Sequence, residues 1–120
     1  MSQDPQTATA PAVLALGRDL MFSSKIAAEG RAAGVGVKIV RDPAALSALV
    51  GRLLLADLAL DGAIEAAAAW GLHTGCTVIG FVSHVDEQTI ARAKQAGLDN
   101  VMSRGSFTRE LPRIFRDLKA

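Results

Sequence analysis

Short apolar runs alternate along the chain with longer stretches in which apolar residues recur at helical spacing. Such runs between turn signals are typical of buried strands. The pattern predicts strands at residues 12–16, 37–40, 53–57, 77–82 and 100–102. It predicts helices at residues 19–33, 42–50, 61–70, 86–96 and from 106 onward, each opened by an Asp or Ser and most of them followed by a Gly.

The alternation of five strands with five helices predicts the fold class. Right-handed crossovers place helices on both faces of a parallel sheet. We therefore expect an α/β, flavodoxin-like (βα)5 sandwich of three layers, with five parallel strands in the order 2-1-3-4-5. Residues 1–11 have little to bury and are expected to form a disordered N-terminal tail. Residues 12–120 are expected to form one domain, because no internal repeat or second domain is visible.

The apolar run at residues 53–57 is the expected centre of the sheet, and it ends in Asp57. In open α/β sheets the carboxyl ends of the strands form the crevice where ligands and chemistry gather. The switch point lies between the first and third strands. The residues that we expect to approach Asp57 in this crevice are Gly17, Arg18, Asp19, Ser83, His84 and Arg104.

Composition narrows the choice of partners. Thirteen Lys and Arg against twelve Asp and Glu give a formal net charge of +1, so nothing indicates binding to nucleic acid or to an anionic membrane. No stretch of eighteen apolar residues free of charges occurs. The N-terminus lacks the basic start and apolar region of a secretory signal, and a single Cys cannot form an internal disulfide. We expect a cytoplasmic protein.

Two segments resemble the receiver domains of bacterial two-component response regulators, the CheY-like domains. Residues 53–58 resemble their phosphoacceptor strand, and residues 78–102 resemble their fourth strand, fourth helix and fifth strand. The resemblance implies phosphotransfer from a histidine kinase to Asp57, helped by Mg²⁺. It also implies readout through the fourth helix, fifth strand and fifth helix. Ser83 falls at or beside the hydroxyl residue that tracks phosphorylation.

The chain departs from these receivers at two places around the crevice. Their first strand ends in an acidic pair that holds Mg²⁺, whereas this chain has Gly17-Arg18, with Asp19 one place later. Their fifth strand ends in a lysine followed by proline, whereas this chain has Arg104-Gly105. Because Mg²⁺ is usually held by carboxylates and phosphate, Asp57 alone is a poor site. We expect no metal or other cofactor; if a magnesium site exists, its ligands are Asp19 and Asp57.

The missing carboxylates favour a degenerate receiver, or pseudo-receiver. Our hypothesis is that Arg18 or Arg104 forms an ion pair with Asp57 and holds the crevice in one state without phosphorylation. A simpler alternative is that Asp57 only caps the turn that follows it, since Asp is common in turns. Asp19 is more typical of a helix N-cap than of a metal ligand. His73 and His84 share no metal-ligand spacing, which argues against zinc.

We therefore predict a stand-alone, non-enzymatic signalling module that binds a protein partner, with a histidine kinase or a downstream effector as candidates, or that forms a homodimer. The expected interface is the fourth helix, fifth strand and fifth helix, and its exposed candidates are Arg92, Gln95, Val101, Phe107 and Arg109. No output domain is expected after the last helix. One alternative is a working receiver phosphorylated on Asp57. A weaker alternative is a small-molecule binder in the crevice, against which the scarcity of aromatic residues argues.

Overall fold

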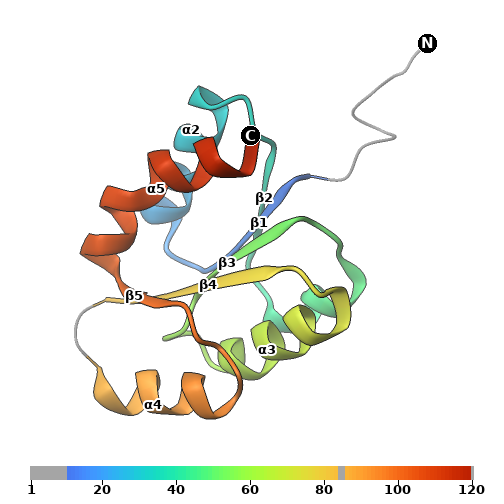
Figure 1. Cartoon of the computed structure of the whole chain (residues 1–120), viewed down its shortest axis with the longest axis vertical. Coiled ribbons are helices and arrows are strands. Elements are labelled where there is room, and N and C mark those ends of the chain that lie inside the picture. Colours follow the sequence, from blue (N-terminus) through green and yellow to red (C-terminus); the bar gives the residue numbers. More distant parts are fainter. Residues whose placement is uncertain (1–10, 84–85, 120) are drawn as a thin grey trace.

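A five-stranded parallel sheet forms the centre of the molecule, in the order β2-β1-β3-β4-β5 (Figure 1). The computed structural model describes residues 11–83 and 86–119, so residues 1–10 of the predicted tail and His84 lie outside the described residues. The strands are β1 (Val13–Leu16), β2 (Val37–Val40), β3 (Leu53–Asp57), β4 (Thr77–Val82) and β5 (Val101–Ser103). The predicted topology is confirmed.

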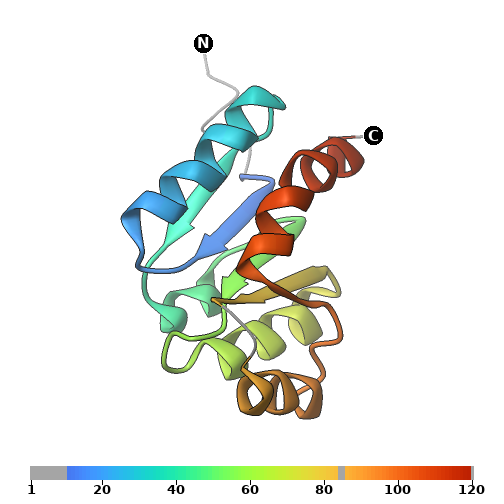
Figure 2. The ribbon, with the colours of Figure 1, turned by 90° about the vertical axis from the view of Figure 1, so that its left-hand side faces the viewer.

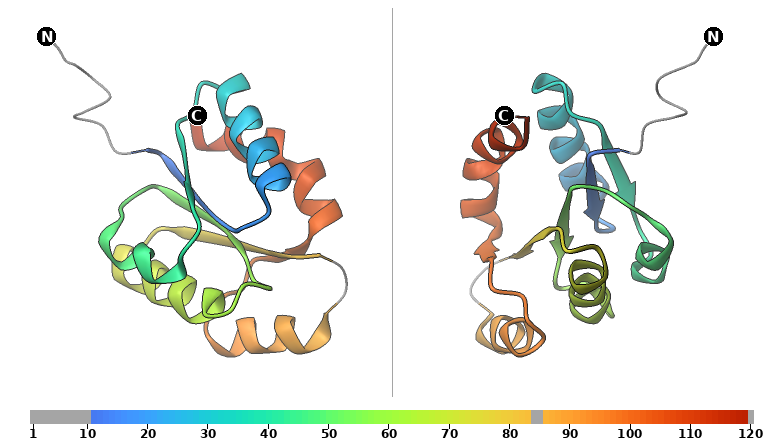
Figure 3. Two further views of the ribbon diagram at one scale, coloured as in Figure 1. Left: turned by 180° about the vertical axis from the view of Figure 1, so that it is seen from behind. Right: turned by 45° about the vertical axis from the view of Figure 1, so that its right-hand side comes forward.

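The helical elements lie on both faces of this sheet, as the right-hand view of Figure 3 shows. They are α2 (Leu20–Ala32), the 3₁₀ helix η1 (Pro43–Ala48), α3 (Ala63–Thr74), α4 (Glu87–Gln95) and α5 (Arg104–Lys119). Helices α2 and α5 pack side by side on one face (Figure 2). Helix α3 and η1 pack on the other face, with Ala93 of α4 joining the same core cluster. Among the described residues, no helix is long and apolar enough to cross a membrane.

The central strand β3 explains why two core layers form. Its first four residues are all buried, because each side chain points to a face that helices cover. Leu53 and Leu55 join the core under α2 and α5, while Leu54 and Ala56 join the core under α3 and η1. This alternation follows from the two-residue period of a strand. Asp57, the last residue of β3, is thereby carried to the carboxyl edge of the sheet.

The second helical element is shorter than predicted. A helix was expected at residues 42–50, but only the 3₁₀ turn η1 forms, capped by Asp42. Leu46 is its buried residue, and Leu49, which follows the last residue of η1, packs on the same core in an extended conformation. The ring Nε1–H of Trp70 donates a hydrogen bond to the carbonyl of Leu49 at 3.0 Å, and Leu49 is extended. The chain therefore leaves the helical conformation at that point.

Helix α3 begins and ends later than the predicted residues 61–70. Gly62 and Gly75 flank it in the left-handed conformation, with φ of 82° and 71°. The expected stop at Gly71 is wrong, since the helix continues through this residue to Thr74. A Cβ at Gly71 would lie 3.0 Å from Cγ2 of Val78. Glycine at this position is therefore explained by close packing of the helix on β4 rather than by a turn.

Helix α5 follows β5 without a loop, and its predicted start at Ser106 is wrong. The hydroxyl of Ser103 accepts a hydrogen bond from the backbone N–H of Ser106 at 3.1 Å. Ser103 thus caps the first turn, and Arg104 is the first residue of the helix. This placement sets the position of the Arg104 side chain at the carboxyl edge of the sheet.

Candidate functional site

The carboxyl ends of β1 and β3 meet at the predicted switch point. The two strands are paired in parallel, so Gly17, which follows β1, lies beside the end of β3. Gly17 is buried, and its N–H donates to the carbonyl of Val40 at 2.9 Å. A Cβ at Gly17 would lie 3.6 Å from the Cβ of Asp57. The position that is acidic in the resembled receivers therefore borders Asp57, but it carries no side chain here.

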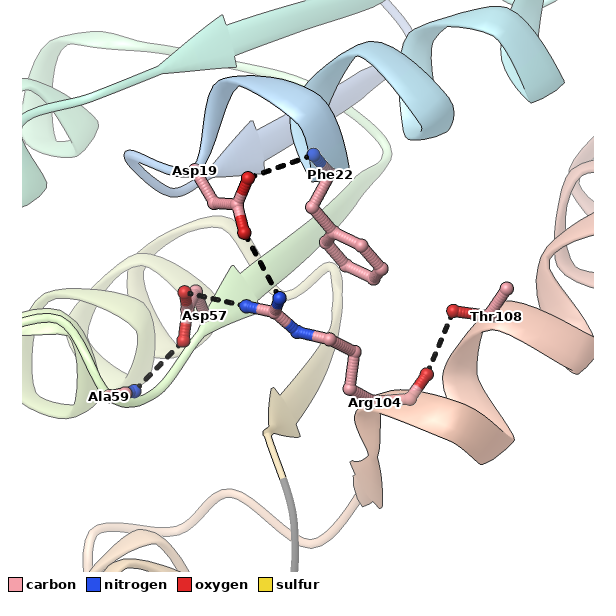
Figure 4. A network of polar contacts seen from close by, with 6 residues as sticks. All are labelled: Asp19, Phe22, Asp57, Ala59, Arg104 and Thr108. Atoms are coloured by element: carbon pink, nitrogen blue, oxygen red, sulfur yellow. Dashed lines mark hydrogen bonds and ion pairs between the residues drawn. The ribbon is translucent and has the colours of Figure 1, made fainter.

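Arg104 bridges two carboxylates at this edge (Figure 4). Its Nη1 atom lies 3.1 Å from Oδ2 of Asp19, and its Nη2 atom lies 3.6 Å from Oδ2 of Asp57. The Arg104 side chain is 29% exposed and that of Asp57 is 15% exposed. Because both groups are largely removed from water, their attraction is screened less than that of a surface pair. The Arg104 alternative of the predicted ion pair is confirmed.

Asp57 also fixes the turn that follows β3. Its Oδ1 atom accepts a hydrogen bond from the backbone N–H of Ala59 at 3.0 Å (Figure 4). Asp57 therefore caps the turn as the simpler alternative predicted, but this is not its only contact, because its other oxygen forms the ion pair with Arg104. Both carboxylate oxygens of Asp57 are thus engaged by the protein itself.

The two carboxylate oxygens of Asp19 also make different contacts. Its Oδ1 atom accepts from the backbone N–H of Phe22 at 3.1 Å, which caps α2, while its Oδ2 atom binds Arg104. The pKa of Asp19 is lowered from the usual aspartate value. The main cause is the hydrogen bond from the backbone of Phe22, and the next is the hydrogen bond from Arg104. The predicted N-cap is confirmed, and Asp19 is held as a carboxylate.

Three mutually packed phenylalanines, which we call the aromatic floor, include two whose rings lie near the guanidinium. The Arg104 Cζ atom lies 4.3 Å from the ring centroid of Phe22 and 5.9 Å from that of Phe81. The Phe81 ring stacks on Phe107 with a centroid separation of 4.5 Å. Among the described residues, the buried Nε of Arg104 has no hydrogen-bond partner. An aromatic face attracts a cation, so these rings hold the guanidinium against the two carboxylates.

Arg18 does not take part in this network. It is exposed, and its Nε donates to the carbonyl of Arg41 at 3.2 Å. The Arg18 alternative of the predicted ion pair with Asp57 is therefore wrong. The reason is local, because the chain turns after buried Gly17 to start α2 and directs Arg18 outward. Ser83 directly follows β4, two residues beyond Phe81, which pairs in register with Asp57. Ser83 is exposed at the same edge of the sheet.

The side chains present do not fit a divalent cation. Gly17 and Arg18 occupy the positions of the resembled acidic pair, and the two nearby carboxylates are both bound by Arg104. Within residues 11–83 and 86–119, no group of three or more His, Cys, Asp or Glu could hold a metal ion. Since Mg²⁺ needs several oxygen ligands and a guanidinium already lies between the two acids, the geometry favours the arginine over the ion.

The predicted interaction face is only partly exposed. Arg92 and Gln95 on α4 and Arg109 on α5 are exposed, and Val101 on β5 is half-buried. Phe107 is 0% exposed, so its assignment to this face is wrong. Its ring lies in the aromatic floor beneath Arg104.

The sequence contained a signal for the burial of Phe107. This residue lies four positions before buried Leu111 and therefore belongs to the apolar stripe of α5. Phe22 and Phe81 were not predicted as parts of the crevice. The approach of Phe22 to Arg104 depends on how α2 and α5 pack, whereas Phe81 lies on β4 in register with Asp57.

Comparisons with known proteins agree on the fold. No family model and no curated protein matches the chain. A CheY-like response regulator receiver domain protein from Methanospirillum hungatei is similar in structure, with a TM-score of 0.75 and 18% identity, over 92% of this chain and 95% of that chain. The receiver domain of the response regulator NarL from Mycobacterium tuberculosis has a TM-score of 0.70 and 18% identity, over 93% and 99%.

A third similar structure carries a modified aspartate. It is a response regulator protein from Burkholderia pseudomallei, described with a phosphorylated aspartic acid, a calcium ion and citrate. Its TM-score is 0.67 and its identity 14%, over 89% of this chain and 69% of that chain.

Proposed function

Because the chain has the fold of response-regulator receiver domains, we propose that it is a pseudo-receiver: a signalling module that acts by binding other proteins. In this proposal it catalyses no reaction, binds no cofactor and is not switched by magnesium-dependent phosphorylation. The observation that carries the proposal is the position of Arg104 between Asp19 and Asp57.

Electrostatics supports this choice over a magnesium site. Two unit charges about 4 Å apart attract by roughly 4 kcal/mol at an effective dielectric constant near 20, before the cost of desolvation is subtracted. A cation entering between Asp19 and Asp57 would have to displace the guanidinium and would remain close to it. It would gain no further carboxylate, because Gly17 and Arg18 stand where the resembled receivers have acids.

The same contacts connect the crevice to the proposed interface. Arg104 is the first residue of α5 and directly follows β5, so its bonds tie the β5–α5 junction to the end of β3 and the start of α2. In the proposal this tie holds the surface formed by α4, β5 and α5 in one arrangement. Its exposed side chains Arg92, Gln95 and Arg109 are the candidates for contact with a histidine kinase or a downstream effector.

A second candidate function rests on the position of Asp57 at the carboxyl end of the central strand. The side chain is 15% exposed at the carboxyl end of β3, and the similar Burkholderia pseudomallei protein carries a phosphorylated aspartic acid. The alternative is therefore a working receiver that accepts phosphate from a histidine kinase on Asp57. It requires Arg104 to leave both carboxylates when phosphate and metal arrive.

Titration with Mg²⁺ and beryllofluoride distinguishes these two functions. We expect the amide resonances around Asp57 and Ser83 of the natural chain to show no saturable, magnesium-dependent shift. The double variant Gly17→Asp/Arg104→Lys should show such shifts. It adds a carboxylate beside Asp57 and replaces the planar guanidinium, with its several donors, by a single ammonium. The matched control Arg18→Ala should behave like the natural chain. Saturable shifts in the natural chain that are lost in Asp57→Asn would refute the pseudo-receiver proposal.

A further inference from the structure

Charge is divided unevenly between the two helical layers of the molecule. Residues 18–41 and 104–119, which include α2, β2 and α5, contain ten Lys and Arg against four Asp and Glu. Residues 42–103, which include η1, α3 and α4, contain three against seven. The net charge of +1, from which no anionic membrane or nucleic acid was expected as a partner, conceals this separation. The distribution of charge, and not its sum, sets what each surface attracts.

Helices α2 and α5 turn basic side chains to solvent on the same side of the sheet. The two helices pack side by side, and the 3.1 Å contact between Arg104 and Asp19 joins the starts of both (Figure 2). Together they form one outer surface, which we call the α2–α5 face. Its exposed cations and large apolar side chains are Leu20, Met21, Lys25, Arg31, Arg109 and Arg116.

The four cations of the α2–α5 face are not neutralised by nearby acids. Within residues 11–83 and 86–119, no carboxylate forms an ion pair with any of them. The exposed positions of α2 include no acid, because its one carboxylate, Glu29, is half-buried. On α5, Glu110 and Asp117 both bind Arg113. The four positive charges therefore remain available to an anionic partner.

Two large apolar side chains accompany these cations. Leu20 is 65% exposed and Met21 is 85% exposed, and both lie in the first turn of α2. Met21 lies four residues before Lys25, so an apolar side chain and a cation project from neighbouring positions on the helix surface. A helix surface that combines exposed apolar side chains with Lys and Arg is typical of segments that lie on an anionic lipid surface.

We propose that the α2–α5 face binds the surface of an anionic lipid bilayer. In this arrangement the four cations contact lipid phosphates, and Leu20 and Met21 enter the boundary between headgroups and acyl chains. The more acidic layer of α3 and α4 then faces away from the membrane, so the separated charges orient the chain on it. This inference does not depend on the function proposed for the crevice.

Two observations favour a bilayer over other polyanions. Nucleic acid would attract the cations through its phosphates, but its backbone offers no apolar contact to Leu20 and Met21. The cations are also spread along two helices and do not converge on one point. A bilayer accommodates such a distribution, because its lipids diffuse and require no fixed spacing between the charges that they meet.

Co-sedimentation of the full chain with lipid vesicles tests the proposal. We expect binding to vesicles of equal parts phosphatidylglycerol and phosphatidylcholine, no binding to pure phosphatidylcholine, and weaker binding as salt is added. Lys25→Glu should weaken the binding by about tenfold or more, because it reverses one charge at the lipid surface. Lys94→Glu is the matched control, since it makes the same change at an exposed position on α4. It should bind like the natural chain, and circular dichroism verifies that both variants are folded.

A fluorescent label reports which side of the molecule meets the lipid and does not rely on the charge variants. In a Cys76→Ser background, Met21→Cys and Leu72→Cys each carry one nitrobenzoxadiazole label at a largely exposed position. The label at residue 21 should brighten when anionic vesicles are added, because it leaves water. The label at residue 72, on α3, should not change.

The proposal is overturned if the natural chain does not bind the anionic vesicles at low salt. Equal weakening by Lys25→Glu and Lys94→Glu overturns it, as does a response of the label at residue 72 without one at residue 21. Fluorescence anisotropy of a labelled DNA duplex is measured in parallel. Binding to the duplex without binding to the vesicles would assign the face to nucleic acid and would also overturn the proposal.

Discussion

The Nη2 atom of Arg104 lies 3.6 Å from the Oδ2 atom of Asp57, so the first residue of α5 is bound to the last residue of β3. The same guanidinium reaches Asp19 at the start of α2 and lies over the ring of Phe22. One side chain therefore joins three elements that are far apart in the sequence.

Replacing Arg104 by Met should destabilise the protein, although the apolar stem is retained. Two carboxylates would lose their shared cation, and Asp57 would remain largely buried without it. Because both partners keep some exposure, we expect the free energy of unfolding to fall by about 1 to 2 kcal/mol, between the values for surface and buried pairs. Urea unfolding at neutral pH measures the change. Arg18→Met, at an exposed site outside the network, should change it by less than about 0.5 kcal/mol.

A double-mutant cycle isolates the contact between Arg104 and Asp57. In an Asp57→Asn background, Arg104→Met should cost less than it costs in the natural chain, by a coupling energy of about 1 kcal/mol. Equal costs in the two backgrounds would mean that the 3.6 Å contact contributes nothing measurable, and that Arg104 acts only through Asp19 and the aromatic floor.

Acid should weaken the fold through Asp19. Its pKa in the folded state is lowered from the ordinary value of 3.8, first by the hydrogen bond from Phe22 and then by that from Arg104. The Asp19 carboxylate thus binds a proton more weakly in the folded state than in the unfolded chain. The stabilisation is fully present above about pH 5 and is lost as the pH falls through 3.8 toward the lowered pKa.

Asp19→Asn provides the measurement, because asparagine can still cap α2 but carries no charge. The variant should be less stable than the natural chain at pH 7, and the difference should shrink toward pH 2 in urea unfolding curves. A stability difference that stays constant over this pH range would show that the charge of Asp19 is not involved. Asp61→Asn, at an exposed position in the turn before α3, controls for the loss of one negative charge.

The start of α5 should depend on Ser103 and not on Ser106. Ser103→Ala removes the hydroxyl that accepts from the N–H of Ser106, and we expect a loss of about 1 kcal/mol in the free energy of unfolding. The Ser106 hydroxyl accepts a hydrogen bond from exposed Arg109, so Ser106→Ala should cost much less. Thermal unfolding of the two alanine variants compares them directly. The reverse order of stabilities would contradict the observed helix start.

Phe107 should matter for stability rather than for partner binding. Phe107→Ala would leave a cavity beside Phe81 and remove part of the floor beneath Arg104, and such truncations cost about 3 to 5 kcal/mol. Arg109→Ala, on the exposed side of the same helix, should leave the unfolding free energy nearly unchanged. Urea unfolding of the two variants tests this. A Phe107→Ala protein as stable as the natural chain would contradict the burial of this ring.

The aromatic floor illustrates where sequence reasoning was incomplete. Phe107 belongs to the same helical stripe as Leu111, Ile114 and Phe115, and all four are buried. Its burial was therefore predictable from periodicity, although it was assigned to the surface. The approach of Phe22 to Arg104 was not predictable in this way. It depends on the packing of α2 against α5, which local patterns do not encode.

The sequence by itself determined the sheet, the order of its strands and the edge at which the crevice forms. Buried apolar runs, helical periodicity and the handedness of crossovers are local or general constraints, and they placed Asp57 beside Gly17. Only the tertiary structure decided between Arg18 and Arg104 as the partner of Asp57. Both arginines lie at the carboxyl edge, but the turn into α2 directs Arg18 to the Arg41 carbonyl. The capped start of α5 directs Arg104 across the crevice, because the direction of a side chain depends on the backbone that carries it.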